Sequence, residues 1–259
     1  MTGKKSPTLA AVSSPPQPEL PTGESKVETV RAMFDTIAPR YDLMNRLLTA
    51  RLDVNWRRRA VSELGLGSGS LVADLACGTG DLCADLARAD LVPIGFDLSA
   101  GMLARAHTRA PLVQADVLRL PLGDQSVDGV TCGFALRNLV ALEPYFVETA
   151  RVVRPGGRMA ILEVAEPDNR LLRAGHSVYF GKVVPWIGAR LSDAEAYGYL
   201  PRSVAYLPDP QHLIAMAESA GFGSVQRTAL FGGVAQLLTA TRLDDNEQAD
   251  PRERTDAKS

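Results

Sequence analysis

The chain has 259 residues, of which 46% are hydrophobic and 22% are charged, and this composition fits one globular domain with a single sizeable core. With 28 basic and 30 acidic residues the formal net charge is −2, which argues against a protein that binds nucleic acid. The cysteines Cys77, Cys83 and Cys132 have no paired spacing and argue against a disulfide framework or a metal site.

Both ends of the chain are predicted to be disordered tails. Residues 1–25 are rich in Pro, Ser, Thr and Gly, and residues 243–259 are polar and charged, so neither segment can bury enough apolar surface to offset its conformational entropy. Prolines stand where a signal peptide has its apolar run, and no stretch approaches the roughly 20 apolar residues of a membrane-spanning helix. We therefore expect a cytoplasmic protein with one domain over residues 26–242.

The first part of that domain, residues 27–66, is predicted to be helical. Phe34 and Ile37 belong to an apolar set that recurs at helical spacing, Pro39 interrupts it, and a second helix is expected to include Trp56.

Short apolar runs then alternate with helical patterns, which predicts an α/β fold with a mostly parallel sheet covered on both faces. The expected strands are 71–75, 92–96, 112–114, 127–132, 159–164, 225–230 and 234–240. The expected helices are 81–88, 101–109, 143–153 and 211–220. Only residues 231–233 separate the last two strands, so they form a hairpin and one of them runs antiparallel. A Rossmann-like sheet with this ending is typical of class I methyltransferases and differs from a dinucleotide-binding fold.

The most informative motif is a glycine-rich loop at residues 72–81, Val-Ala-Asp-Leu-Ala-Cys-Gly-Thr-Gly-Asp, between the first strand and the next helix. Glycine lets the backbone approach a ligand that a Cβ would exclude. Asp74, at the end of the strand, is expected to accept a hydrogen bond from the methionyl ammonium group of S-adenosylmethionine. The alternative is a plain strand-to-helix turn. The cofactor-binding residues expected in this loop are Asp74, Ala76, Gly78, Thr79 and Gly80.

A nicotinamide site is the main competitor, because Gly78 and Gly80 begin a G-x-G-x-x-G pattern. The third glycine position is Cys83, and Asp81 stands at the helix N-terminus where a pyrophosphate would bind. A carboxylate there repels phosphate, whereas S-adenosylmethionine carries none. The local charge therefore favours S-adenosylmethionine.

Polar residues after the next two strands agree with this cofactor. Asp97 is placed to accept hydrogen bonds from both ribose hydroxyls, Met102 to cover the adenine, and Asp116 to accept from the adenine amino group. Each aspartate follows a strand, and open α/β sheets bind their ligands at that edge. The remaining cofactor-binding residues predicted from the sequence are Leu98, Val117 and Gly133.

From about residue 30 to residue 241 the chain resembles the ubiquinone/menaquinone biosynthesis C-methyltransferases of the UbiE type. The matching segments are 33–45, 56–58, 74–81, 134–138, 151–158 and 196–203. The resemblance implies methylation of a ring carbon on a polyprenylated quinol, such as demethylmenaquinol, with S-adenosylmethionine as cofactor.

Several positions depart from the family pattern on the side where the substrate is expected. Family members commonly have a glycine and a histidine ahead of the tryptophan, where this chain has Arg51 and Asp53, and Ala135 replaces a usual glycine. These departures leave open a methyltransferase for another hydrophobic aromatic or polyketide. A cofactor-binding scaffold without catalysis is a third hypothesis.

The leading catalytic candidates are Arg137 and Asn138, just after the fourth strand. A ring carbon attacks well only when a neighbouring hydroxyl is deprotonated, and Arg137 is expected to stabilise the phenolate that forms while Asn138 fixes its geometry. The alternative for Arg137 is a structural ion pair with Asp42 or Glu163. Tyr41 and Asp42 are expected on the opposite wall, with Asp42 either a base or a helix cap.

The segment at about 167–210 is predicted to be an inserted lid. Its apolar content exceeds what a solvent-exposed loop needs, so it is expected to cover a prenyl chain, to rest on a membrane surface or to pack on the sheet. The expected partner is a hydrophobic quinol, with peripheral membrane contact and a homodimer left open.

Overall fold

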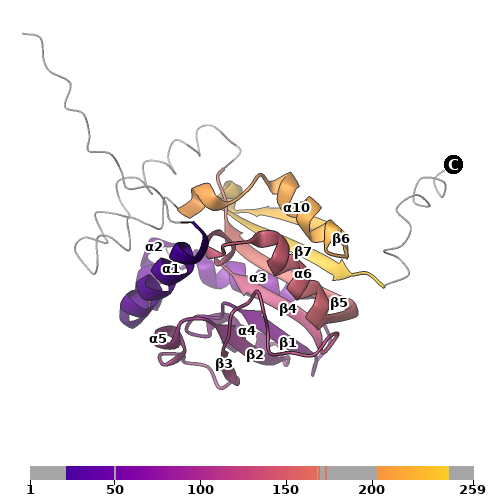
Figure 1. The fold of residues 1–259 in the computed structure, drawn as a ribbon, viewed down its shortest axis with the longest axis horizontal. Coiled ribbons are helices and arrows are strands. Elements are labelled where there is room, and N and C mark those ends of the chain that lie inside the picture. The colour runs from indigo at the N-terminus through magenta and orange to yellow at the C-terminus, as the bar shows by residue number, and fades with distance from the viewer. Residues whose placement is uncertain (1–21, 50, 168, 170–172, 174–202, 245–259) are drawn as a thin grey trace, which may run out of the picture.

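The computed structural model describes residues 22–244 apart from 50, 168, 170–172 and 174–202. Its centre is a seven-stranded sheet in the order β3-β2-β1-β4-β5-β7-β6 (Figure 1). The strands are β1 Leu71–Leu75, β2 Val92–Asp97, β3 Leu112–Gln114, β4 Val127–Gly133, β5 Val153–Val164, β6 Phe222–Leu230 and β7 Ala235–Arg242. The first five strands are parallel, and β7 is antiparallel to both of its neighbours, β5 and β6.

Helices cover both faces of this sheet. The helices are α1 Gly23–Ile37, α2 Tyr41–Leu48, α3 Leu52–Leu64, α4 Asp81–Arg88, α5 Ala100–Leu103, α6 Leu142–Val152 and α10 Pro210–Ser219. Single 3₁₀ turns lie at Ala38–Arg40, Leu136–Asn138, Val204–Tyr206 and Phe231–Gly233. Helices α6 and α10 pack on one face and α3 and α4 on the other. Helices α1 and α2 lie together at one end of the sheet (Figure 1).

The apolar runs in the sequence reflect this double cover. Along β1, Ala73 and Leu75 join the cluster under α6 and α10, whereas Val72 joins the cluster under α3 and α4. All three side chains are fully buried. A strand covered on both faces needs apolar residues at consecutive positions, which explains why β1 reads as a continuous run and not as an alternation.

The predicted architecture is confirmed, with differences at particular ends. The helix expected at 101–109 ends at Leu103, because the chain then turns back and the His107 N–H donates to the carbonyl of Thr79 at 3.1 Å. Strand β5 begins at Val153, six residues before its predicted start. Helix α1 begins at Gly23, so the last three residues of the predicted N-terminal tail are helical. The rest of both tails and most of the predicted lid lie outside the described residues.

Among the described residues, no helix combines the length and apolar character needed to cross a membrane.

Arg51, which precedes α3, adopts a left-handed backbone with φ of 64° and makes no side-chain cap. This conformation costs a residue with a Cβ about 1–2 kcal/mol, and glycine adopts it freely. We therefore expect Arg51→Gly to raise the free energy of unfolding by about 1 kcal/mol, measured by urea denaturation. Gly65 ends the same helix with φ of 66°, so Gly65→Ala should lower that free energy by a similar amount. A loss of stability in Arg51→Gly would show that its side chain has a compensating role.

Candidate cofactor and active site

A pocket lies at the carboxyl ends of β1, β2, β3 and β4 and encloses about 820 Å³, a volume that includes its open mouth. The carboxyl ends of parallel strands meet at one edge of the sheet, so short loops from four strands line the same hollow. Helix α1 supplies a further wall through Val27, Val30, Arg31 and Phe34. Eight of the cofactor-binding residues predicted from the sequence line this pocket: Ala76, Gly78, Asp97, Leu98, Met102, Asp116, Val117 and Gly133.

Asp97 is the best-organised acceptor in the pocket. One carboxylate oxygen accepts from the Gly78 N–H at 2.8 Å, and the other accepts from the Ser99 N–H at 2.8 Å. Burial raises the pKa of Asp97, while these two backbone donors act in the opposite direction. Each carboxylate oxygen keeps further lone pairs. The arrangement suits a ligand that presents two adjacent hydroxyl groups, as a ribose does.

The adjoining part of the pocket, towards β3, is apolar with one polar group at its edge. Met102 and Val117 are buried, and Leu98 lines the same region. Asp116 is exposed, and its carboxylate accepts from the Leu118 N–H at 2.9 Å. A flat apolar ring with one exocyclic donor, such as adenine, matches these surroundings.

Three predicted cofactor residues of the glycine-rich loop, Asp74, Thr79 and Gly80, do not line the pocket. Asp74 is fully buried and accepts from the Thr131 hydroxyl at 2.8 Å and from the Cys83 thiol at 3.3 Å. Burial raises the pKa of Asp74 to about 7. Gly80 is the N-cap residue of α4 and has a φ of 83°, and a Cβ there would meet the Thr108 side chain at 2.5 Å. The structure thus gives Asp74 and Gly80 contacts that shape the loop.

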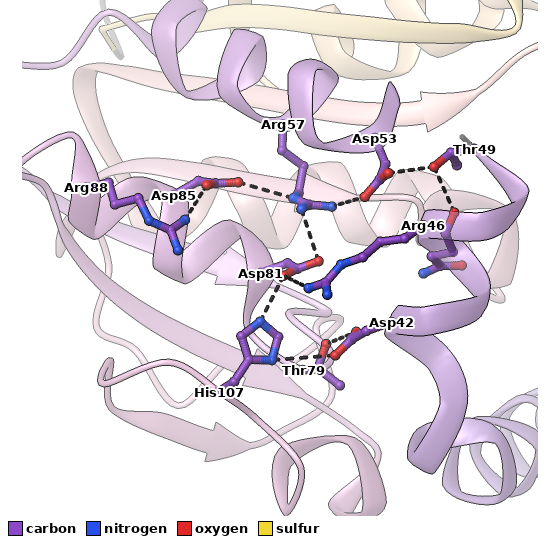
Figure 2. A network of polar contacts seen from close by, with 11 residues as sticks. Asp42, Arg46, Thr49, Asp53, Arg57, Thr79, Asp81, Asp85, Arg88 and His107 are labelled. Atoms are coloured by element: carbon purple, nitrogen blue, oxygen red, sulfur yellow. Dashed lines mark hydrogen bonds and ion pairs between the residues drawn. The ribbon is translucent and has the colours of Figure 1, made fainter. Parts of the chain in front are cut away.

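Thr79, the third of these residues, joins the loop to the N-terminal helices. Its hydroxyl donates to Asp42 at 2.6 Å, and Figure 2 shows this contact beside His107. The two ring nitrogens of His107 lie 2.8 Å from Asp81 and 3.5 Å from Asp42. Deeper in the same network, Arg57 contacts Asp81 together with two further carboxylates (Figure 2). These contacts fasten α2 and α3 to the glycine-rich loop and α4.

The two predicted catalytic residues after β4 have different surroundings. The Arg137 guanidinium is buried, forms an ion pair with Glu163 and donates to the Phe134 carbonyl at 2.6 Å, and it does not line the pocket. This is the Glu163 alternative considered from the sequence. Asn138 does line the pocket and is 8% exposed. Among the described residues its Oδ1 has no hydrogen-bond partner, although buried oxygens usually have one.

Of the two candidates on the opposite wall, only Tyr41 lines the pocket. Its ring packs edge to face on Phe34, with 5.8 Å between ring centroids. Burial raises the pKa of the Tyr41 phenol, while a hydrogen bond from Asn45 and the positive charge of Arg137 act against that rise. Asp42 lies in the first turn of α2 and faces Thr79 and His107 instead.

Sequence reasoning missed the wall that α1 contributes. Its C-terminal end is held by Asp35, which accepts from the Ser99 hydroxyl at 2.5 Å and from the Gly101 N–H at 2.9 Å. The helical spacing that includes Val30 and Phe34 was visible, but such a pattern does not tell whether the apolar face meets a core or a cavity.

No group of three or more His, Cys, Asp or Glu side chains in the described part of the chain has a geometry that could hold a metal ion.

Comparison with known proteins gives the relationship of this chain. The model of the ubiE/COQ5 methyltransferase family matches residues 22–242. The ubiquinone/menaquinone biosynthesis C-methyltransferase UbiE of Syntrophotalea carbinolica is 39% identical over 226 residues, which cover 83% of this chain and 94% of that protein. The demethylmenaquinone methyltransferase of a Roseiflexus species is 38% identical over 240 residues, which cover 86% of this chain and 97% of that protein.

Solved structures share the fold at lower identity. A SAM-dependent methyltransferase from Thermotoga maritima superposes with a TM-score of 0.59 at 17% identity, covering 82% of this chain and 99% of that one. The phosphoethanolamine N-methyltransferase 2 of Haemonchus contortus, solved with S-adenosyl-L-methionine, superposes with a TM-score of 0.55 at 14% identity. The match covers 73% of this chain and 53% of that one. The family match, the similarity to these relatives and the class I methyltransferase sheet lead to one conclusion: the chain belongs to the ubiE/COQ5 family of S-adenosylmethionine-dependent methyltransferases.

Proposed function

We propose that this enzyme transfers the methyl group of S-adenosylmethionine to a ring carbon of a polyprenylated quinol, with demethylmenaquinol as the acceptor. Relatives that carry this activity in their names cover more than four-fifths of the chain. The observation that carries the proposal is the Oδ1 of Asn138, which is buried in the pocket wall after β4 and has no hydrogen-bond partner among the described residues. A rotation of the Asn138 amide would turn this oxygen toward the pocket, where a hydroxyl group of the acceptor would satisfy it.

The cofactor side of the proposal rests on the residues after β1, β2 and β3. Asp97 would hold the ribose hydroxyls, Met102 and Val117 would enclose the adenine, and Asp116 would accept from its amino group. The glycine-rich loop at Gly78 would pass close to the rest of the ligand. When bound, the cofactor supplies a methyl group on a positively charged sulfur.

The acceptor side rests on the wall after β4. A quinol carbon becomes a good nucleophile when the adjacent hydroxyl gives up its proton, so groups that stabilise negative charge beside that hydroxyl lower the barrier. Arg137 does not line the pocket, so we propose an indirect contribution: its charge acts against the rise in the pKa of the Tyr41 phenol on the pocket wall. Its ion pair with Glu163 fixes the 3₁₀ turn Leu136–Asn138 and so the position of the Asn138 amide.

The contacts of Asp42 support a positioning role and not a base. Its carboxylate already accepts from the Thr79 hydroxyl and faces His107, and it does not line the pocket. We propose that Asp42 holds the glycine-rich loop against α2.

Peripheral contact with a membrane is part of this proposal, because a polyprenyl chain partitions into lipid. Most of the predicted apolar lid that would make the contact lies outside the described residues. Homodimer formation stays a prediction.

The test is mass spectrometry of reactions that contain isotope-labelled S-adenosylmethionine and chemically reduced demethylmenaquinol. We expect the label on a ring carbon. Asn138→Leu should lower kcat by about 100-fold, the effect of removing one well-placed hydrogen-bonding group, while the dissociation constant for cofactor stays within about twofold of wild type. Val147→Ala, at an exposed position of α6, serves as the control.

Two outcomes would contradict the proposal. Cofactor binding without label transfer to the quinol would direct attention to another hydrophobic aromatic acceptor. Normal turnover in Asn138→Leu would show that the acceptor does not bind at the wall after β4.

A further inference from the structure

Lys26 of α1 is a buried cation with an unusual set of partners. The side chain is 4% exposed, and its Nζ donates to the Leu139 carbonyl at 2.6 Å. The same Nζ lies 3.6 Å from the centroid of the Tyr206 ring, in cation–π geometry. Within the described residues it forms no ion pair with a carboxylate. A lysine that is buried without a countercharge is uncommon and calls for a reason other than stability.

Burial lowers the pKa of the Lys26 ammonium from 10.5 to about 8, and burial is its only resolved cause. The groups that face the ammonium from neighbouring elements are the Leu139 carbonyl and the aromatic ring of Tyr206, whose phenol is the titratable group among them. No charged side chain in the described part of the chain shifts the pKa of Lys26 appreciably. Near neutral pH the side chain is mainly cationic, and it loses its charge as the pH rises through about 8.

The strand order places Lys26 at a definite end of the pocket. The pocket crosses the neighbouring strands from β3, where Asp116 stands, through β2 and β1 to β4. Leu139 and Val140 line it after β4, and Val27, the neighbour of Lys26, lines it from α1. Lys26 is therefore on the β4 side, away from the two aspartates proposed to hold adenosine.

Helix α1 is thus held at both ends by polar contacts, with its pocket-lining residues between them. At the C-terminal end, Asp35 binds the loop after β2 through Ser99 and Gly101. At the N-terminal end, Lys26 binds the wall after β4 and the 3₁₀ turn Val204–Tyr206. The first anchor belongs to the cofactor side of the pocket and the second to the acceptor side.

We propose that Lys26 is a positioning residue for the methyl acceptor, because it fixes α1, the Leu139–Val140 wall and Tyr206 around the acceptor end of the pocket. This inference rests on the proposed assignment of the β2–β3 side to adenosine. On this proposal Lys26 sets the width of the acceptor end of the pocket. The contacts of Asp35 support cofactor binding instead.

The test measures both substrates in matched variants. Lys26→Met keeps much of the apolar stem and removes the charge; it should raise KM for the quinol about tenfold, the size expected when one charged hydrogen bond is lost. The dissociation constant for S-adenosylmethionine, measured by calorimetry, should stay within about twofold. Lys26→Arg keeps the positive charge, so its KM for the quinol should be close to the wild-type value. Tyr206→Leu removes the ring that faces the ammonium and should also raise the quinol KM.

A pH profile supplies a readout that a merely structural role would not move. In the wild type the quinol KM should rise above pH 8 as the ammonium is lost, and in Lys26→Arg it should stay flat across that range. Thr29→Ala, at an exposed position of α1, controls for general effects on the helix.

The proposal is overturned if Lys26→Met leaves the quinol KM unchanged, or if it weakens cofactor binding as much as it raises that KM. Asp97→Ala distinguishes a failure of the Lys26 proposal from a wrong assignment of the pocket to the cofactor. If Asp97→Ala abolishes cofactor binding and Lys26→Met has no effect, only the role of Lys26 is refuted. If Asp97→Ala binds cofactor normally, the assignment of the pocket itself is wrong.

Discussion

Replacing Arg57 with methionine is expected to lower the free energy of unfolding by about 3–5 kcal/mol, the cost of leaving buried charge without its partner. The guanidinium lies 2.5 Å from Asp53, 3.1 Å from Asp81 and 3.2 Å from Asp85 (Figure 2). Asp53 and Asp85 are themselves buried, so water cannot take over the role of the arginine. The surrounding carboxylates raise the pKa of Arg57 although burial acts to lower it, which shows that their attraction outweighs desolvation.

The measurement is urea denaturation followed by circular dichroism, with Arg59→Met as the control. Arg59 belongs to the same helix and forms an ion pair at 3.2 Å with Glu63, four residues later in the chain. The side chains of Arg59 and Glu63 are both about half exposed, so this ion pair should contribute no more than about 1 kcal/mol to the free energy of unfolding. Equal losses in the two variants would mean that the network around Arg57 contributes no more than a surface ion pair.

The second large effect is expected at Asp97, where alanine should weaken S-adenosylmethionine binding by at least about 100-fold. Two ribose hydroxyls would lose a charged acceptor, and each such hydrogen bond contributes about 1.5–3 kcal/mol. The N–H groups of Gly78 and Ser99 would also lose the carboxylate that orients the two loops they belong to. Calorimetry with S-adenosylhomocysteine measures the loss without turnover.

Asp116→Ala is the matched comparison for Asp97→Ala. Asp116 is exposed and accepts from one backbone N–H, that of Leu118, so its removal should weaken binding about tenfold or less. A thermal melt of the free enzyme checks that Asp97→Ala is folded. If the folded variant binds cofactor as tightly as wild type, Asp97 is not the ribose acceptor.

The sheet was predictable because its determinants are local. A strand covered on both faces must be apolar over consecutive residues, and the strand–helix alternation implied the parallel order that the structure shows. The three residues at 231–233 were too few for a crossover, so the antiparallel β7 also followed from the sequence. The end of α5 could not be predicted from the sequence, because it depends on a backbone hydrogen bond between His107 and Thr79, which are 28 residues apart in the chain.

The sequence by itself determined the fold class and placed the glycine-rich loop and aspartates at the strand ends, because strand register delivers those residues to one edge wherever the sheet forms. Which side chains face the pocket was decided only by the tertiary structure. Asn138 lines the pocket while its neighbour Arg137 turns to Glu163, since β4 and β5 pair side by side and bring that carboxylate beneath the turn. Lys26 and Leu139 are 113 residues apart, and no local pattern indicates that they meet. The physical reason is that periodicity and propensity act over a few residues, whereas the partner of a buried charge is chosen by the packing of the whole domain.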